Sequence, residues 1–320
     1  GYFRRSGAKN LNMSGSFVTS DSMLAYANSA GTFRYHSWTN SNIILLLTAS
    51  DGRIGWAEQH GPFFDDLDVE ARFDEALGKV RIPGEPGEIE PGRYTVVLEE
   101  MAVSFLWHVM AFDGFSALAL EQGRSFFTDS IGKKVTGENI TIHDNIYHPL
   151  IRGVPFDYEG VCRQEVPLID KGVAMGVTHN RRTAGRSGGE STGHSLPPGV
   201  PYGPFPRNLV MEPGTVKRNE LIKGVDKGIL ITRLWYVNTR DERQALLTGM
   251  TRGGTFWIEN GVPVRPLKNL RFNEKVLDAF SRCSGISDGR RVCASEFGGH
   301  GAFPCVRLED FHITGCSKSL

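Results

Sequence analysis

Short apolar segments, separated by glycine-rich turns, run through most of this sequence. Residues 33–38 and 43–48 lie in a stretch that alternates apolar and polar positions, and residues 228–237 form a further predicted strand. The 38 glycines in 320 residues supply turns between such strands. Asp-Lys-Gly at 170–172 and Glu-Asn-Gly at 259–261 each predict a hairpin. The chain is therefore predicted to be rich in sheets and turns.

Residues 83–87, Pro-Gly-Glu-Pro-Gly, are the clearest interruption of the chain. Two prolines and two glycines stop any helix there, so we place a domain boundary near residue 88. Residues 183–206 are rich in Gly, Ser and Pro and predict a long loop. Helices are predicted at four places: residues 65–78, residues 101–122 with a break at Gly114, residues 218–227, and residues 273–282 with Asn273 as cap.

The charge balance argues against several classes of partner. Lys plus Arg and Asp plus Glu number 36 each, so no net field favours nucleic acid or an anionic membrane. The longest apolar runs, such as residues 43–49, are far shorter than the roughly 20 residues of a membrane-spanning helix. The five cysteines are odd in number and scattered, which is typical of reduced thiols and predicts a cytoplasmic protein.

The histidines offer only partial imitations of a metal site. None of the nine is followed by Glu, so a His-Glu zinc helix is absent. His143 and His148 flank an acid, but they follow a predicted strand and precede a proline, which favours a solvated loop over a metal site. His108 and Asp113 lie on a predicted helix, and Cys293 could be a third ligand. The alternatives are a partly buried helical histidine and a small buried thiol.

A glycine-rich loop is the candidate binding segment. It combines backbone donors with small side chains, which suits the close approach of another chain. A basic cluster that includes Arg182 precedes it and could hold a peptide carboxylate or backbone. An ordinary packed loop and a solvated basic face are the alternatives. The predicted peptide-binding residues are Arg182, Glu190, Ser191, Thr192, Gly193 and His194.

Six ordered motifs make this sequence similar to one known family. They are Gly-Arg-Ser-Phe-Phe at 123–127, Pro-Phe-Asp-Tyr-Glu-Gly-Val at 155–161, Glu-Ser-Thr-Gly-His at 190–194, Met-Glu-Pro-Gly at 211–214, Gly-Ile-Leu-Ile-Thr-Arg at 228–233 and Phe-Trp-Ile-Glu-Asn-Gly at 256–261. In order and spacing they resemble the TldD/PmbA family, also called the modulator of DNA gyrase family. The resemblance covers about residues 16–320 and is densest between residues 91 and 275.

The resemblance implies an α+β fold in two domains. Residues 1–88 would be the remainder of an N-terminal α/β domain, because family members usually have a longer N-terminal segment. Residues 89–320 would form a larger peptidase-like domain of curved, mostly antiparallel sheets with a few helices.

The resemblance also implies a function. TldD-type members bind zinc through two His and a C-terminal Cys, use Glu as base, and cleave unfolded or short peptides. TldE/PmbA-type members lack the motif and pair with TldD. Counting back from residue 123 places His108 at the first His, Val109 at the Glu and Asp113 at the second His, with Cys293 near the Cys ligand.

These positions favour a non-catalytic, TldE-like subunit that binds peptide. Its partner would be a TldD-like zinc-bearing subunit or a second copy of itself, and it would need no cofactor of its own. The alternative is a divergent metal-dependent hydrolase in a specialised, for example biosynthetic, pathway. That enzyme would hold zinc with His108, Asp113 and Cys293.

Overall fold

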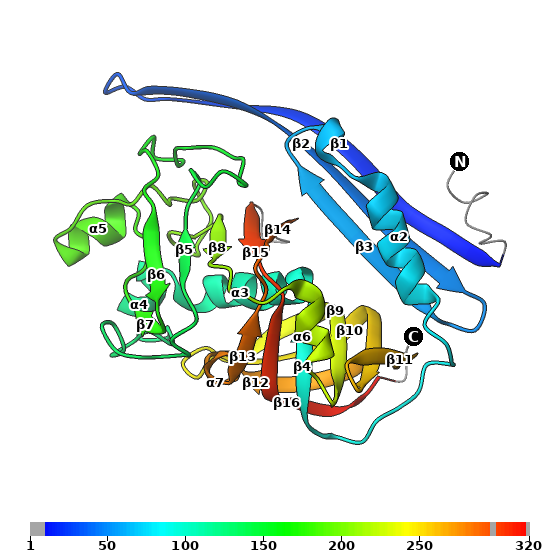
Figure 1. The fold of residues 1–320 in the computed structure, drawn as a ribbon. Helices are drawn as coiled ribbons and strands as arrows, with labels where there is room; N and C mark the ends of the chain where they lie inside the picture. Colours follow the sequence, from blue (N-terminus) through cyan, green and yellow to red (C-terminus); the bar gives the residue numbers. More distant parts are fainter. Residues whose placement is uncertain (1–9, 295–298, 318–320) are drawn as a thin grey trace.

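The computed structural model of the chain describes residues 10–294 and 299–317. In these residues the strands form three sheets, of three, seven and six strands, and six α-helices pack around them (Figure 1). Most strand pairs are antiparallel, and the exceptions are β4 with β9 and β15 with β8. The predicted α+β class with mostly antiparallel sheets is therefore confirmed.

The three-stranded sheet begins with a long hairpin. Its strands are β1 (Leu11–Ala27), β2 (Phe33–Ala49) and β3 (Ile54–Gly61), paired in that order. The predicted strands at 33–38 and 43–48 are thus two parts of the single strand β2. The tip of the β1–β2 hairpin reaches over the six-stranded sheet (Figure 1), where the ring of Tyr26 packs against Gly160.

Helix α2 (Val69–Val80) covers one face of this sheet, after a short 3-10 turn η1 (Phe64–Asp66). The predicted helix start at residue 65 is therefore too early, because Asp68 is the N-cap and accepts a hydrogen bond from the Ala71 amide at 2.9 Å. Gly55 of β3 allows close packing, since a Cβ there would lie 1.9 Å from the Ala76 carbonyl oxygen.

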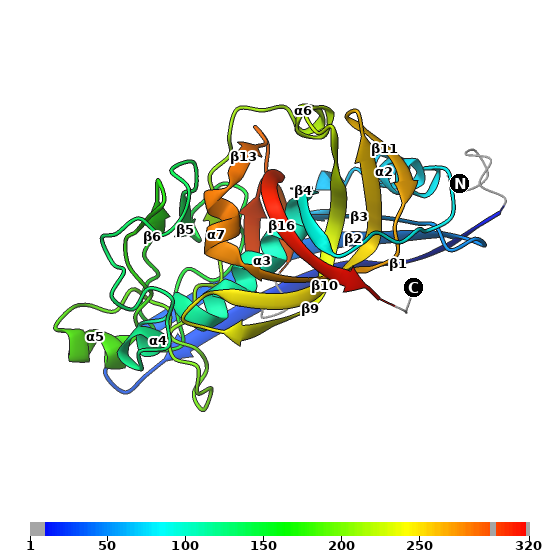
Figure 2. The same ribbon diagram turned by 90° about the horizontal axis from the view of Figure 1, so that it is seen from below.

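Five strands of the seven-stranded sheet close into a small barrel. Going round it, β10 pairs with β12, β12 with β16, β16 with β4, β4 with β9, and β9 again with β10 (Figure 2). Strands β11 and β13 extend it by pairing with β10 and β16. The bounds are β4 (Gly92–Leu98), β9 (Lys227–Asp241), β10 (Leu246–Glu259), β11 (Val262–Pro266), β12 (Leu270–Lys275), β13 (Cys283–Ile286) and β16 (Val306–Cys316).

Glycines and irregular pairing allow this barrel to close. The register between β9 and β10 shifts between Arg252 and Thr255, where Gly253 and Gly254 have φ values of 75° and 122°. Side chains rarely adopt such φ values, and bulges of this kind bend a strand. The hairpin predicted at residues 259–261 joins β10 to β11, so this prediction is confirmed.

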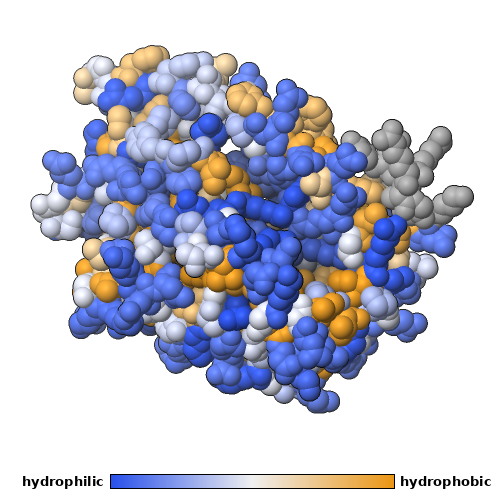
Figure 3. Space-filling model, viewed as in Figure 1, coloured by the Kyte–Doolittle hydropathy of each residue, from blue (hydrophilic) through white to orange (hydrophobic). Residues whose placement is uncertain are grey.

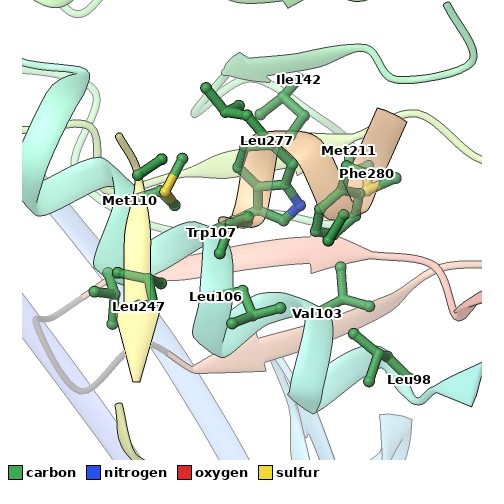
Figure 4. Close-up of a cluster of buried hydrophobic side chains, with 14 of the residues drawn as sticks. Leu98, Val103, Leu106, Trp107, Met110, Ile142, Met211, Leu247, Leu277 and Phe280 are labelled. Carbon is green, nitrogen blue, oxygen red and sulfur yellow. The ribbon is translucent and has the colours of Figure 1, made fainter. Parts of the chain in front are cut away.

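Helix α3 (Glu100–Gly114) lies between the barrel and the six-stranded sheet. Trp107 of α3 packs against Phe280 of helix α7 (Val276–Ser281), with ring centroids 4.7 Å apart (Figure 4). Ile142 and Met211 close the other side of this cluster. The sheet contains β14 (Arg291–Ala294), β15 (His300–Phe303), β8 (Leu209–Met211), β5 (Ile142–Asp144), β6 (Val166–Asp170) and β7 (Val173–Ala174), in that order.

The remaining helices begin or end at other residues than predicted, except at Gly114. Gly114 is the last residue of α3, and a side chain would not fit there because a Cβ would lie 2.1 Å from the Phe126 ring. Helix α4 (Ala117–Glu121) follows separately. The predicted loop at 183–206 is wrong at its start, where Asn180 caps α5 (Arg181–Ser187). Helix α6 (Arg218–Lys223) is shorter than predicted. Asn273 belongs to β12, so the predicted cap is wrong and α7 begins at Val276.

The surface seen in Figure 3 is mostly hydrophilic, with separate hydrophobic patches. In the described residues no helix is long and apolar enough to cross a membrane.

Candidate functional site

His108 lies in the interior, where α3 meets the six-stranded sheet. Its Nδ1 atom is 2.9 Å from the Ser104 carbonyl oxygen, which can only accept, so Nδ1 carries the proton. Its Nε2 atom has no hydrogen-bond partner among the described residues, and the Phe303 ring packs against the imidazole. Burial, with a smaller contribution from His300, lowers the pKa of His108 to about 4. The imidazole is therefore neutral at pH 7.

Asp113 points away from His108. At about 100° per residue, five residues of a regular helix place two side chains about 140° apart around the axis. Asp113 accepts a hydrogen bond from the Thr239 hydroxyl of β9, whereas His108 packs against Phe303 of β15. Burial raises the pKa of Asp113 to about 6. The five-residue spacing in the sequence already predicts that the two side chains face different sides, because α3 is a helix through both positions.

Cys293 of β14 is buried on the same side of α3 as His108. The Ser104 hydroxyl lies 3.0 Å from His108 Nδ1 and also interacts with the Cys293 thiol. Burial, then the nearby carboxylates of Glu58 and Glu100, raise the pKa of this thiol well above its ordinary value of 9.0. In the absence of a metal ion this environment therefore favours the neutral thiol over the thiolate.

The three side chains aligned with the family's zinc ligands therefore do not converge. His108 and Cys293 both contact Ser104, but Asp113 is directed toward β9. No group of three His, Cys, Asp or Glu residues in the described chain is arranged to hold a metal ion. The arrangement does not fit a zinc centre, and we derive no reaction step through one.

The second histidine pair is also divided. His143 of β5 lies near Glu165 and Glu212 at 3.9 and 3.7 Å. His148 follows in a turn, where its Nδ1 accepts from the Leu150 amide at 3.2 Å and its Nε2 is 3.1 Å from Arg290. Burial, and then the charge of Arg290, lower the pKa of His148. The two imidazoles therefore have different hydrogen-bond partners, although Glu165 and Glu212 act on both of them.

Asp144, between those histidines, has a structural role that sequence reasoning missed. It is fully buried and accepts from His194 Nε2 at 2.9 Å and from the Asn208 amide at 2.7 Å. His194 Nδ1 is 2.9 Å from the Thr192 hydroxyl. These contacts hold the predicted peptide-binding loop in place from its buried side. Nothing local in the sequence links residues 144 and 194, which are 50 positions apart.

The anchoring divides the predicted peptide-binding residues into two groups. His194 is fully buried and Gly193 packs so closely that a Cβ would lie 2.5 Å from the Cys162 carbonyl oxygen. Glu190 and Ser191 instead line an open surface hollow together with Arg34 and Arg181. Arg182 is exposed on α5 and is not among the residues that line this hollow. Only part of the loop is thus available for contact with another molecule.

A cavity of about 220 Å³ lies where α2, β3, the start of α3 and β14 meet. Five of its lining residues belong to a network of charged side chains that also includes Lys79 and Arg218; the five are Arg72, Glu75, Glu99, Glu100 and Arg291. The pKa of Glu75 shows how strongly the charges of this network act on one another. Burial alone would raise its pKa, but Lys79, Arg291 and Arg218 outweigh burial and lower the pKa to about 2. The seven residues come from distant segments, so sequence reasoning did not group them.

The network connects the three-stranded sheet to the rest of the molecule. Lys79 of α2 donates to Glu99 at 2.6 Å, just before α3. Arg218, the first residue of α6, donates to Glu99 at 2.9 Å and to Glu100 at 3.2 Å. Buried ion pairs are costly to break, because the remaining charge has no partner and little water. The network therefore holds α2 against α3 and α6.

The sequence of this chain is similar to that of a known family and of several known proteins. The profile of the PmbA/TldA metallopeptidase C-terminal domain matches residues 91–315. A Methanothermobacter thermautotrophicus metalloprotease is 26% identical over 293 residues, covering 87% of this chain and 62% of that protein. A TldD homologue of Buchnera aphidicola is 28% identical over 271 residues, covering 78% and 55%. The chain thus spans little more than half the length of these relatives.

Solved structures share the fold. The crystal structure of TldE from Thermococcus kodakarensis has a TM-score of 0.87 and 21% identity, and the match covers 98% of this chain and 71% of that one. A Thermotoga maritima protein, described as a candidate modulator of a DNA gyrase, has a TM-score of 0.82 and 22% identity, covering 98% and 72%.

Proposed function

Since this chain belongs to the PmbA/TldD metallopeptidase family, we propose that it is a non-catalytic, TldE-like subunit. It binds peptide and supports a zinc-bearing, TldD-like partner in the proteolysis of unfolded or short peptides. All five cysteines are unpaired, which supports a reducing compartment such as the cytoplasm as its place of work.

The chemistry of α3 is the observation that carries this proposal. At the position of the catalytic Glu stands Val109, a buried side chain that belongs to the main hydrophobic cluster. A valine cannot take a proton from water, so the family's general base is absent. Asp113, at the position of the second His, is held by Thr239 on another side of the helix. Both changes support a helix that has become part of the core.

Peptide binding is assigned to the exposed part of the loop at residues 190–194. Glu190 and Ser191 face the surface hollow, and the buried Asp144–His194 pair keeps the loop backbone in place. An extended peptide can form backbone hydrogen bonds with the exposed part of such a loop without strong sequence preference. Arg182 is exposed on α5, which precedes the loop in the sequence. It would contact a carboxylate or the backbone of the same peptide.

One observation favours the alternative of a divergent hydrolase. The Nε2 lone pair of His108 is unpartnered among the described residues. The Cys293 thiol interacts with Ser104, whose hydroxyl lies 3.0 Å from Nδ1 of the same imidazole. A neutral imidazole and a cysteine are common zinc ligands. The direction of Asp113 opposes it, so we keep it as the rival that the experiment must separate.

The test combines this chain with a family member that carries His-Glu-x-x-x-His. We expect a stable complex on size-exclusion chromatography, zinc only in the partner, and hydrolysis of a short unfolded peptide only by the mixture. Failure to form any complex would contradict the proposal. Stoichiometric zinc and hydrolysis by this chain alone, both lost in His108→Ala but kept in His312→Ala, would establish the rival instead.

A further inference from the structure

Three arginines line a second cavity, of about 410 Å³, under the tip of the β1–β2 hairpin. They are Arg152, Arg163 and Arg207. Among the described residues, no Asp or Glu lines this cavity. A concentration of like charge beside a low-dielectric wall creates a strong positive potential. This volume also lies in the usual range of ligand pockets, roughly 300–1,000 Å³.

Arg163 is the unusual member of this group, because only 6% of it is exposed. Its Nη1 donates to the Asn208 side-chain oxygen at 3.2 Å, and its Nε has no hydrogen-bond partner among the described residues. Within that part of the chain it forms no ion pair. Burying a guanidinium with an unmet donor is costly unless something else supplies an acceptor.

The nearest carboxylates are already occupied. Asp144 accepts from His194 and from the Asn208 amide. Asp157 accepts backbone hydrogen bonds from Glu159 and Val161 on one oxygen and from Ser195 on the other. Both acids hold local structure, so neither is free to turn toward the arginines. Their charges act on Arg163 without a direct ion pair, so in the described part of the chain the lining itself carries the three arginines and no carboxylate.

Apolar side chains also line the cavity. Met23 and Leu24 of β1, Trp38 of β2 and Phe156 contribute to it. Met23 is 73% exposed, which is unusual for a large apolar side chain and leaves the cavity open to solvent at the hairpin. A ligand that fits both kinds of side chain has an anionic group at one end and an apolar group directly beside it.

We propose that this cavity binds the C-terminal residue of a peptide. Arg163 and Arg207 hold the terminal carboxylate, while the apolar side chain of that residue lies between Trp38 and Phe156. The planar guanidinium suits the two oxygens of a carboxylate. The proposal rests on the peptide-binding function proposed above and adds to it recognition of a free C-terminus. Phosphate would match the arginines equally well, but it leaves the apolar side chains without a partner.

The test compares N-acetyl-Ala-Phe with its C-terminal amide by isothermal titration calorimetry on the full chain. We expect the acid to bind at least ten-fold more tightly than the amide. Arg163→Gln and Arg207→Gln should reduce the affinity for the acid to that for the amide. Arg240→Gln, an exposed arginine of β9 outside this cavity, is the matched control and should change neither affinity. If Arg163→Gln does not melt cooperatively, the result for Arg207→Gln decides the test, because Arg207 is partly exposed.

Each other outcome overturns the inference in a distinguishable way. Equal binding of acid and amide removes C-terminal recognition but leaves peptide binding intact. Binding of neither probe contradicts peptide binding as well. If inorganic phosphate at millimolar concentration displaces the acid, and binds on its own with the same dependence on Arg163 and Arg207, the cavity is a phosphate site and the carboxylate assignment is wrong.

Discussion

Glu75 offers the sharpest test of the charged network around the 220 Å³ cavity. Its carboxylate lies 2.6 Å from Arg72, 2.9 Å from Arg291 and 3.2 Å from Lys79, and these cations lower its pKa from 4.5 to about 2. Glu75→Gln keeps the shape of the side chain and removes the charge. The substitution should therefore destabilise the protein at neutral pH and make its stability less dependent on acid.

The magnitude follows from the two pKa values. A shift of about 2.5 pKa units corresponds to about 3 kcal/mol of folding free energy at pH 7. Because the folded-state pKa lies below the ordinary value, the stabilisation is complete above about pH 5 and is lost as the pH falls toward 2. With the same pKa values, less than half of this stabilisation remains at pH 3.

Urea unfolding at pH 7 and pH 3 measures this difference. The gap in unfolding free energy between wild type and Glu75→Gln should be about 3 kcal/mol at pH 7 and less than half of that at pH 3. Glu88→Gln is the control, because Glu88 pairs with Lys268 on the exposed surface and should show little effect. A gap that stays constant between the two pH values would refute the electrostatic account of Glu75.

Three further predictions test packing and reactivity. Trp107→Ala should cost about 3–5 kcal/mol in urea unfolding, and a loss below about 1 kcal/mol would contradict its central place in the core. Gly55→Ala should push α2 off its sheet and lower the melting temperature sharply, whereas Gly78→Ala, with open space at its Cβ, should be neutral or mildly stabilising. Cys293 should resist iodoacetamide at pH 8 while exposed Cys162 reacts, and mass spectrometry that finds equal labelling would show that Cys293 is accessible.

Sequence reasoning succeeded where neighbouring residues carry the signal. The turns at 170–172 and 259–261 form hairpins, because Lys171, Gly172, Asn260 and Gly261 adopt the positive φ values that such turns need. Gly114 ends a helix as predicted. The family was recognisable because its motifs are short and contiguous, and the match over residues 91–315 confirms it.

Sequence reasoning failed where a distant segment decides the outcome. Asn273 has the chemistry of a helix cap, but residues 270–275 pair with β10 and β16, and strand pairing outweighs a cap of about 1 kcal/mol. The apparent break between residues 38 and 43 disappears for a similar reason, since β2 pairs with β1 along its whole length.

The sequence by itself determined the family, the α+β class, the hairpin turns and the absence of a His-Glu pair, because each depends on residue types close together in the chain. Only the tertiary structure decided that a five-stranded barrel closes, that Thr239 of β9 is the partner of Asp113, and that Arg152, Arg163 and Arg207 share one cavity. Those outcomes depend on how strands and helices from remote segments pack against one another.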